Sequence, residues 1–172
     1  MVLIDGRSGS GKTTLGTRLA EHLGAELVSL DDVYPGWHGL AAASRTVGES
    51  IVVGESPGYR RWDWEKSEPT NWRALDSSAP LVVEGAGSLT PASARHATLR
   101  VWLELDTATR RARALARDGG TYEPWWDVWA AQEDEHIERN DPRSLADVVQ
   151  VSSSAEPRAQ RRGDRPGFLR LR

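Results

Sequence analysis

Residues 2–13 read Val-Leu-Ile-Asp-Gly-Arg-Ser-Gly-Ser-Gly-Lys-Thr, a short apolar run followed by the pattern G-x-x-x-x-G-K-T without a mismatch. The apolar run predicts a buried strand, and Leu15, Leu19 and Leu23 predict a helix that begins near Lys12. A glycine-rich turn between a strand and a helix can wrap backbone N–H groups around an anion, and the helix N-terminus adds partial positive charge. The stretch is therefore predicted to be a phosphate-binding loop, or P-loop.

In such a loop, Lys12 is expected to reach the β- and γ-phosphates of ATP or GTP, and the Thr13 hydroxyl is expected to ligate Mg²⁺. Lys12 and Lys66 are the only lysines among 22 basic residues, which favours a specific use for the Lys12 ammonium group. The dinucleotide fingerprint G-x-G-x-x-G fails because Thr14 stands where its third glycine belongs. The expected nucleotide-binding residues are Gly6, Ser8, Gly9, Ser10, Gly11, Lys12, Thr13 and Thr14.

The composition narrows the class of protein. A chain of 172 residues is expected to form one domain with a real core. Its net charge of −3 gives no case for a nucleic-acid partner, and its lack of cysteine excludes disulfides and cysteine-based metal sites. No signal peptide and no run of about 18 apolar residues is visible, so no membrane partner is expected. A nucleotide-using protein of this kind is expected in the cytoplasm.

Apolar runs alternate with helical patterns, which predicts an α/β protein with a mainly parallel sheet. Strands are expected at 2–5, 26–30, 81–84, 99–105 and 146–151, and helices at 12–23, 91–96, about 107–117 and about 124–139. Residues 36–79 are less regular, with a short strand expected at 51–53 and the start of a helix at 71–75. The predicted fold is a three-layer P-loop NTPase fold with a five-stranded sheet, helices on both faces and a helical lid.

We expect a kinase-like P-loop domain over residues 1–151, with the acceptor bound by 34–75 and a lid at 110–129. The tail, residues 152–172, differs in composition from the rest of the chain. From residue 158 onward it holds six arginines and one aspartate. Such a segment is typical of a solvated terminus, and contact with phosphate or a partner is the alternative.

Acidic residues follow two of the predicted strands. Asp31 and Asp32 come directly after the second strand, and Glu84 ends the third. Ligands of open α/β sheets bind beyond the carboxyl ends of the strands, so these carboxylates are expected to face the same crevice as the P-loop. One aspartate can act as general base while Asp32 and Glu84 help to hold Mg²⁺. The alternative for the two aspartates is a turn or helix-capping role, and the alternative for Glu84 is a strand-end carboxylate bonded to the backbone.

Several segments resemble the uridine kinase family. Residues 29–34, Ser-Leu-Asp-Asp-Val-Tyr, are similar to its D-x-F-Y segment, with Val33 in place of Phe. Residues 59–64, 81–85 and 146–149 are similar to its aspartate-aromatic segment, its Glu-Gly strand end and its final "AD" strand. The family phosphorylates nucleosides at a sugar hydroxyl with ATP or GTP and Mg²⁺. The resemblance implies that Asp31 is the general base and that Tyr34 contacts the substrate.

Arginines and tryptophans complete the expected site. Arg110, Arg113 and Arg117 share one helix face, and lid arginines at such a position stabilise the charge on a transferring phosphate; a solvated face is the alternative. Trp62 and Trp64 can stack on a base or sugar, although core packing is the usual fate of a tryptophan. The expected catalytic residues are Lys12, Asp31, Arg113 and Arg117, and the expected substrate contacts are Asp32, Tyr34, Arg60, Arg61, Trp62 and Asp63.

These features favour a small-molecule kinase that uses ATP or GTP, Mg²⁺ and a nucleoside-like acceptor. Arg60 and Arg61 are the candidates for binding a phosphate already on the acceptor, so a nucleoside monophosphate kinase is the second interpretation, followed by a sugar or antibiotic kinase. A regulatory ATPase without an acceptor, or a module that binds nucleotide without turnover, belongs to another class. The Asn/Thr-Lys-x-Asp segment of GTPases is absent around Lys66.

Overall fold

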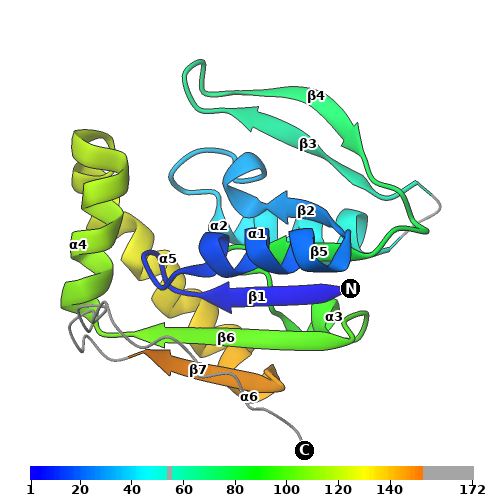
Figure 1. Ribbon diagram of the computed structural model, residues 1–172. Helices are drawn as coiled ribbons and strands as arrows, with labels where there is room; N and C mark the ends of the chain where they lie inside the picture. The colour runs from blue at the N-terminus through cyan, green and yellow to red at the C-terminus, as the bar shows by residue number, and fades with distance from the viewer. Residues whose placement is uncertain (54–55, 153–172) are drawn as a thin grey trace, which may run out of the picture.

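The computed structural model describes residues 1–53 and 56–152. Its centre is a five-stranded sheet in the order β2-β5-β1-β6-β7, with every neighbouring pair parallel (Figure 1). The fold expected from the sequence is therefore confirmed. The strands of this sheet are β1 (Val2–Gly6), β2 (Glu26–Ser29), β5 (Leu81–Glu84), β6 (Leu99–Leu105) and β7 (Val148–Ser152).

Helices cover both faces of the sheet. Figure 1 shows α1 in front of it, with α3, α5 and α6 behind. Two 3₁₀ turns, Gly119–Thr121 and Glu123–Trp125, join α4 to α5, and a third, η1 (Leu30–Asp32), follows β2. The helices are α1 (Lys12–Leu23), α2 (Leu40–Thr46), α3 (Pro91–Ala94), α4 (Thr107–Asp118), α5 (Trp126–Asn140) and α6 (Pro142–Leu145).

The alternation of side chains along β1 divides the core into two halves. Val2 and Ile4 pack with residues of α1 on one face, whereas Leu3 faces the other and joins the larger cluster that includes α2 and α5. All five residues of β1 are buried, as expected for the central strand of a sheet covered on both faces. The P-loop that follows β1 is thus mounted on the most rigid part of the fold.

The middle of the chain differs from expectation. Residues 71–75 do not begin a helix, because β3 (Gly58–Asp63) and β4 (Glu68–Ala74) form an antiparallel hairpin outside the main sheet (Figure 1). Residues 51–53 do not form a strand, because Val47–Ile51 is a π-helical turn that continues α2. The strand expected at 51–53 relied on a short apolar run, and in the structure Ile51 and Val52 pack into the core cluster instead of joining a sheet.

The arginine-rich tail lies beyond Ser152 and therefore outside the described residues, so its expected solvated state stays a prediction. In the described part of the chain, no helix has the length and apolar character needed to cross a membrane.

Candidate active site

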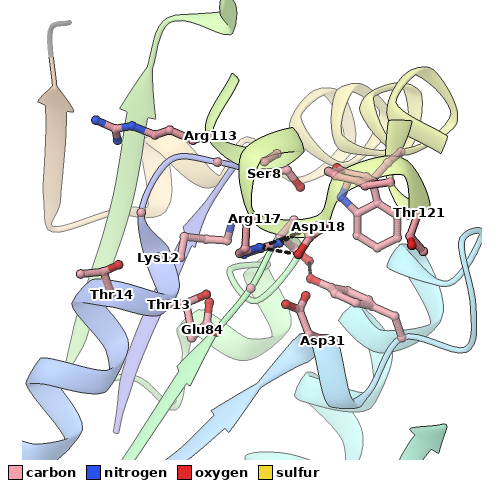
Figure 2. Close-up of a pocket in the computed structure, with 18 of the residues that line it drawn as sticks. Ser8, Lys12, Thr13, Thr14, Asp31, Glu84, Arg113, Arg117, Asp118 and Thr121 are labelled. Carbon is pink, nitrogen blue, oxygen red and sulfur yellow. Dashed lines mark hydrogen bonds and ion pairs between the residues drawn. The ribbon is translucent and has the colours of Figure 1, made fainter. Parts of the chain in front are cut away.

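A cavity of about 810 Å³ opens at the carboxyl ends of β1, β2 and β5, beside α4. It brings together residues that are far apart in the sequence (Figure 2). The predicted site residues that line it are Ser8, Gly9, Gly11, Lys12, Thr13, Thr14, Asp31, Tyr34, Glu84, Arg113 and Arg117. Those that do not line it are Gly6, Ser10, Asp32, Arg60, Arg61, Trp62 and Asp63.

The P-loop needs glycine at two positions in particular. Gly9 has φ +79°, and a Cβ there would meet the Arg110 carbonyl oxygen at 2.2 Å, so a side chain has no room. Gly11 has φ +102° and directly precedes α1. The Lys12 side chain is buried and donates a 3.1 Å hydrogen bond from Nζ to the Arg7 carbonyl oxygen. This contact folds the lysine over the loop, toward the place where phosphates would bind.

Two carboxylates face this loop (Figure 2). Asp31 is exposed to the cavity, and desolvation by the nearby protein raises its pKa, while Arg117 and Lys12 oppose the shift. Glu84 is buried at the end of β5, where burial raises its pKa, and Lys12 and a hydrogen bond from Ser29 oppose that shift. Both carboxyls therefore hold a proton more readily than an exposed acid does.

The expectation that both aspartates face the crevice holds for Asp31 alone. Asp32 points to the hairpin, where its Oδ2 accepts a 3.0 Å hydrogen bond from the Arg61 guanidinium. Successive residues of the tight turn η1 project in different directions, so an Asp-Asp pair here cannot place both carboxylates in one site. The structure accordingly brings neither Asp32 nor Arg61 to the cavity.

The rest of the expected acceptor segment serves the hairpin itself. Asp63 accepts hydrogen bonds of 3.0 Å from the backbone N–H groups of Glu65 and Lys66, which shape the turn between β3 and β4. Arg60 donates to the Thr70 carbonyl oxygen on the facing strand. The Trp62 ring is half-buried, and its indole N–H has no partner in the described structure. Within residues 59–64, the residue that lines the cavity is Trp64.

The three lid arginines separate into two roles. Arg113 and Arg117 line the cavity, whereas Arg110 is buried at the base of α4 and does not. In Figure 2, Arg117 points to the centre beside Lys12 and Asp31, and the Arg113 guanidinium extends away from them. Arg117 is also paired with its neighbour Asp118, at 2.7 Å between Nη2 and Oδ2.

An aromatic wall, which we define as Tyr34, Trp37, Trp64, Tyr122 and Trp129, closes the side of the cavity beside α5. Trp37 is its centre, with ring centroids 4.9 Å from Trp64, 5.4 Å from Tyr122 and 6.4 Å from Trp129. Tyr34 is buried, and its hydroxyl donates to the Ala86 carbonyl oxygen at 2.9 Å. The wall offers flat apolar surface to a bound ring.

Sequence reasoning missed several contributors to this site, among them Tyr122, Trp129 and the buried Glu133, which contacts the P-loop. The helical spacing of Trp129 predicts packing alone, and an isolated glutamate in a charged helix carries no recognisable pattern. The placement of Trp125 and Trp129 four residues apart is the one available indication of an aromatic face.

The cavity also fits Mg²⁺. Among the residues the structure describes, no group of three or more His, Cys, Asp or Glu side chains is arranged to hold a metal ion. Thr13 and Glu84 both line the cavity, so a hydroxyl and a carboxylate oxygen donor stand together at its floor (Figure 2). Mg²⁺ takes one or two protein oxygens and completes its shell with phosphates and water, so this sparse oxygen pair suits it.

Comparison with known sequences gives partial matches. No protein-family model matches the chain. It is 30% identical over 126 residues to a cytidylate kinase from Methanococcoides burtonii, a match that covers 72% of this chain and 66% of that protein. It is 33% identical over 120 residues to a cytidylate kinase from Archaeoglobus fulgidus, covering 69% and 62%, and 30% identical over 117 residues to a shikimate kinase from Symbiobacterium thermophilum, covering 66% and 62%. The matched region thus spans slightly less than two thirds of these relatives.

Solved structures match over more of the chain. A structure described as a possible uridine kinase from Bacillus stearothermophilus covers 86% of both chains with a TM-score of 0.54 and 21% identity. A gluconokinase from Sinorhizobium meliloti covers 91% of this chain, is itself covered over 83%, and has a TM-score of 0.51 at 19% identity. Identities this low establish the fold, and at that level the expected likeness to uridine kinase-like P-loop proteins is confirmed.

Proposed function

Since this chain has the fold of the small P-loop kinases, we propose that it transfers the γ-phosphate of ATP or GTP to a hydroxyl group of a nucleoside-like acceptor. The observation that carries the proposal is the arrangement of the cavity. Asp31 stands beside Lys12 of the P-loop and Arg117 of α4, and the aromatic wall stands alongside. These are the parts that phosphoryl transfer to a small ring-containing alcohol requires.

In this proposal the P-loop amides and Lys12 hold the nucleotide phosphates, and Arg117 stabilises the charge that develops on the transferring group. When the nucleotide binds, the Arg117 guanidinium leaves its ion pair with Asp118 and binds phosphate instead. Thr13 and Glu84 would hold Mg²⁺, which neutralises phosphate charge when it is bound. Asp31 orients the acceptor hydroxyl and takes its proton as the new P–O bond forms.

The raised pKa of Asp31 supports this assignment. A general base works best when its pKa lies near the operating pH, because a strongly acidic carboxylate has little affinity for the proton. The cations Arg117 and Lys12 oppose this rise and favour the ionised, proton-accepting form. Asp31 thus combines the required position with the required basicity.

The acceptor is proposed to be uncharged. Arg60 and Arg61, the residues expected to bind an acceptor phosphate, are engaged in the hairpin and with Asp32. Among the described residues that line the cavity, Arg113 and Arg117 are the only arginines. Arg117 is assigned to the transferring phosphate, and the Arg113 guanidinium extends away from Lys12 and Asp31. Two of the relatives above carry the name cytidylate kinase, and this keeps a nucleoside monophosphate as the second candidate acceptor.

A coupled assay of ADP release tests the proposal. The protein, ATP and Mg²⁺ are combined with nucleosides, nucleoside monophosphates, sugars or aminoglycosides in turn, and phosphorylated products are identified by mass. Nucleosides are expected to stimulate ADP release. Stimulation by monophosphates alone selects the second candidate, and ATP hydrolysis that no acceptor stimulates contradicts kinase activity. We also propose that the protein is cytoplasmic and that residues 1–151 form the kinase domain.

A further inference from the structure

The Ser8 residue of the P-loop is held on both of its backbone polar groups by buried, charged side chains. The Glu133 carboxylate of α5 accepts a 2.7 Å hydrogen bond from the Ser8 N–H, and Glu133 is only 2% exposed. Nη1 of Arg110 donates a 3.2 Å hydrogen bond to the Ser8 carbonyl oxygen, and Arg110 is 3% exposed.

Arg110 is itself fixed in place. Its Nε donates to the Leu105 carbonyl oxygen and its Nη2 to Thr107 Oγ1, each at 3.1 Å, so the guanidinium cannot rotate without losing several hydrogen bonds. Its backbone presses against Gly9, where any Cβ would collide with the Arg110 carbonyl oxygen. The base of α4 therefore acts as a rigid support for the first half of the P-loop.

The two charges also compensate each other. A buried carboxylate next to a phosphate site would repel the ligand, because electrostatic interactions are strong where water is excluded. Glu133 and Arg110 both hydrogen-bond to the backbone of Ser8, so the two opposite charges meet at the same residue. The pair can therefore hold the loop without adding net negative charge beside the phosphates.

We propose that Glu133 and Arg110 are positioning residues that hold Ser8 and so keep the P-loop in its phosphate-binding shape before nucleotide arrives. The inference rests on the proposed function, since it assigns how the nucleotide half of that site is prepared. A loop that presents backbone N–H groups to an anion site has little to stabilise it without the anion, and rigid support lowers the ordering cost of binding. Neither residue contacts the reacting atoms.

Two substitutions at Glu133 separate the hydrogen bond from the charge. Glu133→Gln keeps an oxygen at the same reach, so ADP affinity is expected to stay within about threefold of the original. Glu133→Asp keeps the charge but withdraws the acceptor by one methylene, so ADP is expected to bind roughly tenfold more weakly, the scale of one hydrogen bond to a charged group. Glu138→Asp, on the exposed side of α5, is the matched control and is expected to leave ADP binding unchanged.

Calorimetric titration with ADP, thermal unfolding and steady-state kinetics provide the readouts. Glu133→Asp is expected to raise the KM for ATP while kcat and the unfolding midpoint stay close to those of the original protein. A variant that merely disturbs the fold would lower kcat and the midpoint as well, and that result would overturn the proposal. Equal ADP affinity in the original protein and its three variants would also overturn the proposal, but it would not contradict the proposed kinase function.

A measurement on the unmodified protein tests the proposal even if the variants fail to fold. Amide hydrogen exchange of the unmodified protein, free of nucleotide, is expected to show a protected Ser8 N–H, and free exchange there would overturn the proposal. If the unmodified protein binds neither ADP nor ATP, the proposed function itself fails. That outcome is distinct from binding that is indifferent to Glu133.

Discussion

The Glu84 carboxylate accepts a 2.6 Å hydrogen bond from the Ser29 hydroxyl, and the two residues stand directly opposite each other on β5 and β2. This contact fixes a buried acid at the floor of the cavity, beside the P-loop. Burial raises the pKa of Glu84, so its ionised form lowers the stability of the folded protein even while it serves the site.

The Glu84→Gln variant should unfold at a higher temperature than the original protein at pH 7. A carboxyl whose folded-state pKa is raised binds more protons in the folded than in the unfolded state, so stability falls as the pH rises from the unfolded pKa through the folded one. Glutamine keeps the oxygen that Ser29 needs and removes this penalty. The gain should disappear below about pH 4, where both states are protonated.

Thermal unfolding from pH 3.5 to 7.5 measures this difference, with the exposed Glu138→Gln as control. Phosphoryl transfer should fall in Glu84→Gln at the same time, because the proposed Mg²⁺ ligand is lost. A midpoint that is lower than in the original protein at pH 7, or a gap independent of pH, would contradict the account.

Lys12→Ala should weaken ATP binding and abolish transfer, because the ammonium group is the cation placed within the P-loop. Lys12→Arg should not restore activity, since the wider planar guanidinium does not fit where a compact charge is buried. ATP titration and turnover of the two variants test this. Turnover at the original rate in Lys12→Ala would rule out the assignment of the loop.

Asp31→Asn should keep ATP affinity within a few-fold and lower kcat by roughly 10²–10⁴, the usual contribution of a positioned general base. Asp32→Asn is a natural control, because Asp32 pairs with Arg61 outside the cavity and its loss should change kcat little. Measured against pH, the original rate should rise as Asp31 loses its proton, with a midpoint above the ordinary aspartate pKa. The Asp31→Asn variant should lack this rise. If Asp32→Asn lowers kcat and Asp31→Asn does not, Asp32 rather than Asp31 is the general base.

Trp37→Leu should raise the acceptor KM about tenfold, the scale of one lost aromatic stacking contact plus part of its buried area, and leave the KM for ATP unchanged. Trp37 is the centre of the aromatic wall, whereas Trp72 on the hairpin is 48% exposed and does not line the cavity. Trp72→Leu is therefore the matched control. Equal changes in both KM values for Trp37→Leu would mean that the wall is structural.

The sequence is sufficient to predict those elements that depend on a short local pattern. β1, the P-loop and α1 follow from a continuous apolar run, a glycine pattern and leucine spacing, and β5 and β6 from apolar runs whose ends match the prediction. The β3–β4 hairpin escapes prediction, because it lies outside the main sheet and its strands lack a continuous buried face. Asp63 is predicted as a ligand because turn-forming and ligand-binding aspartates look the same in a sequence.

The other half of the site depends on contacts between distant segments. Glu133 meets Ser8 across 125 positions of the chain, and Trp37 meets residues of the segment that joins α4 to α5. Such pairings follow from how the helices pack on the sheet, which no local pattern encodes. Asp31 could be predicted from its place after a strand, whereas the direction of Asp32 is decided by the turn η1.

The rings of Trp37 and Trp125 are nearly parallel, at an interplanar angle of 6° and a centroid separation of 5.7 Å, and two further tryptophans of the aromatic wall face the cavity. Indole emission shifts to shorter wavelength when water leaves the surroundings of the ring. A compound that enters this cavity will therefore change the natural ultraviolet fluorescence of the protein. Tryptophan fluorescence can therefore report whether the cavity is occupied. Compound libraries can be screened in this way without a label and before any reaction product is known.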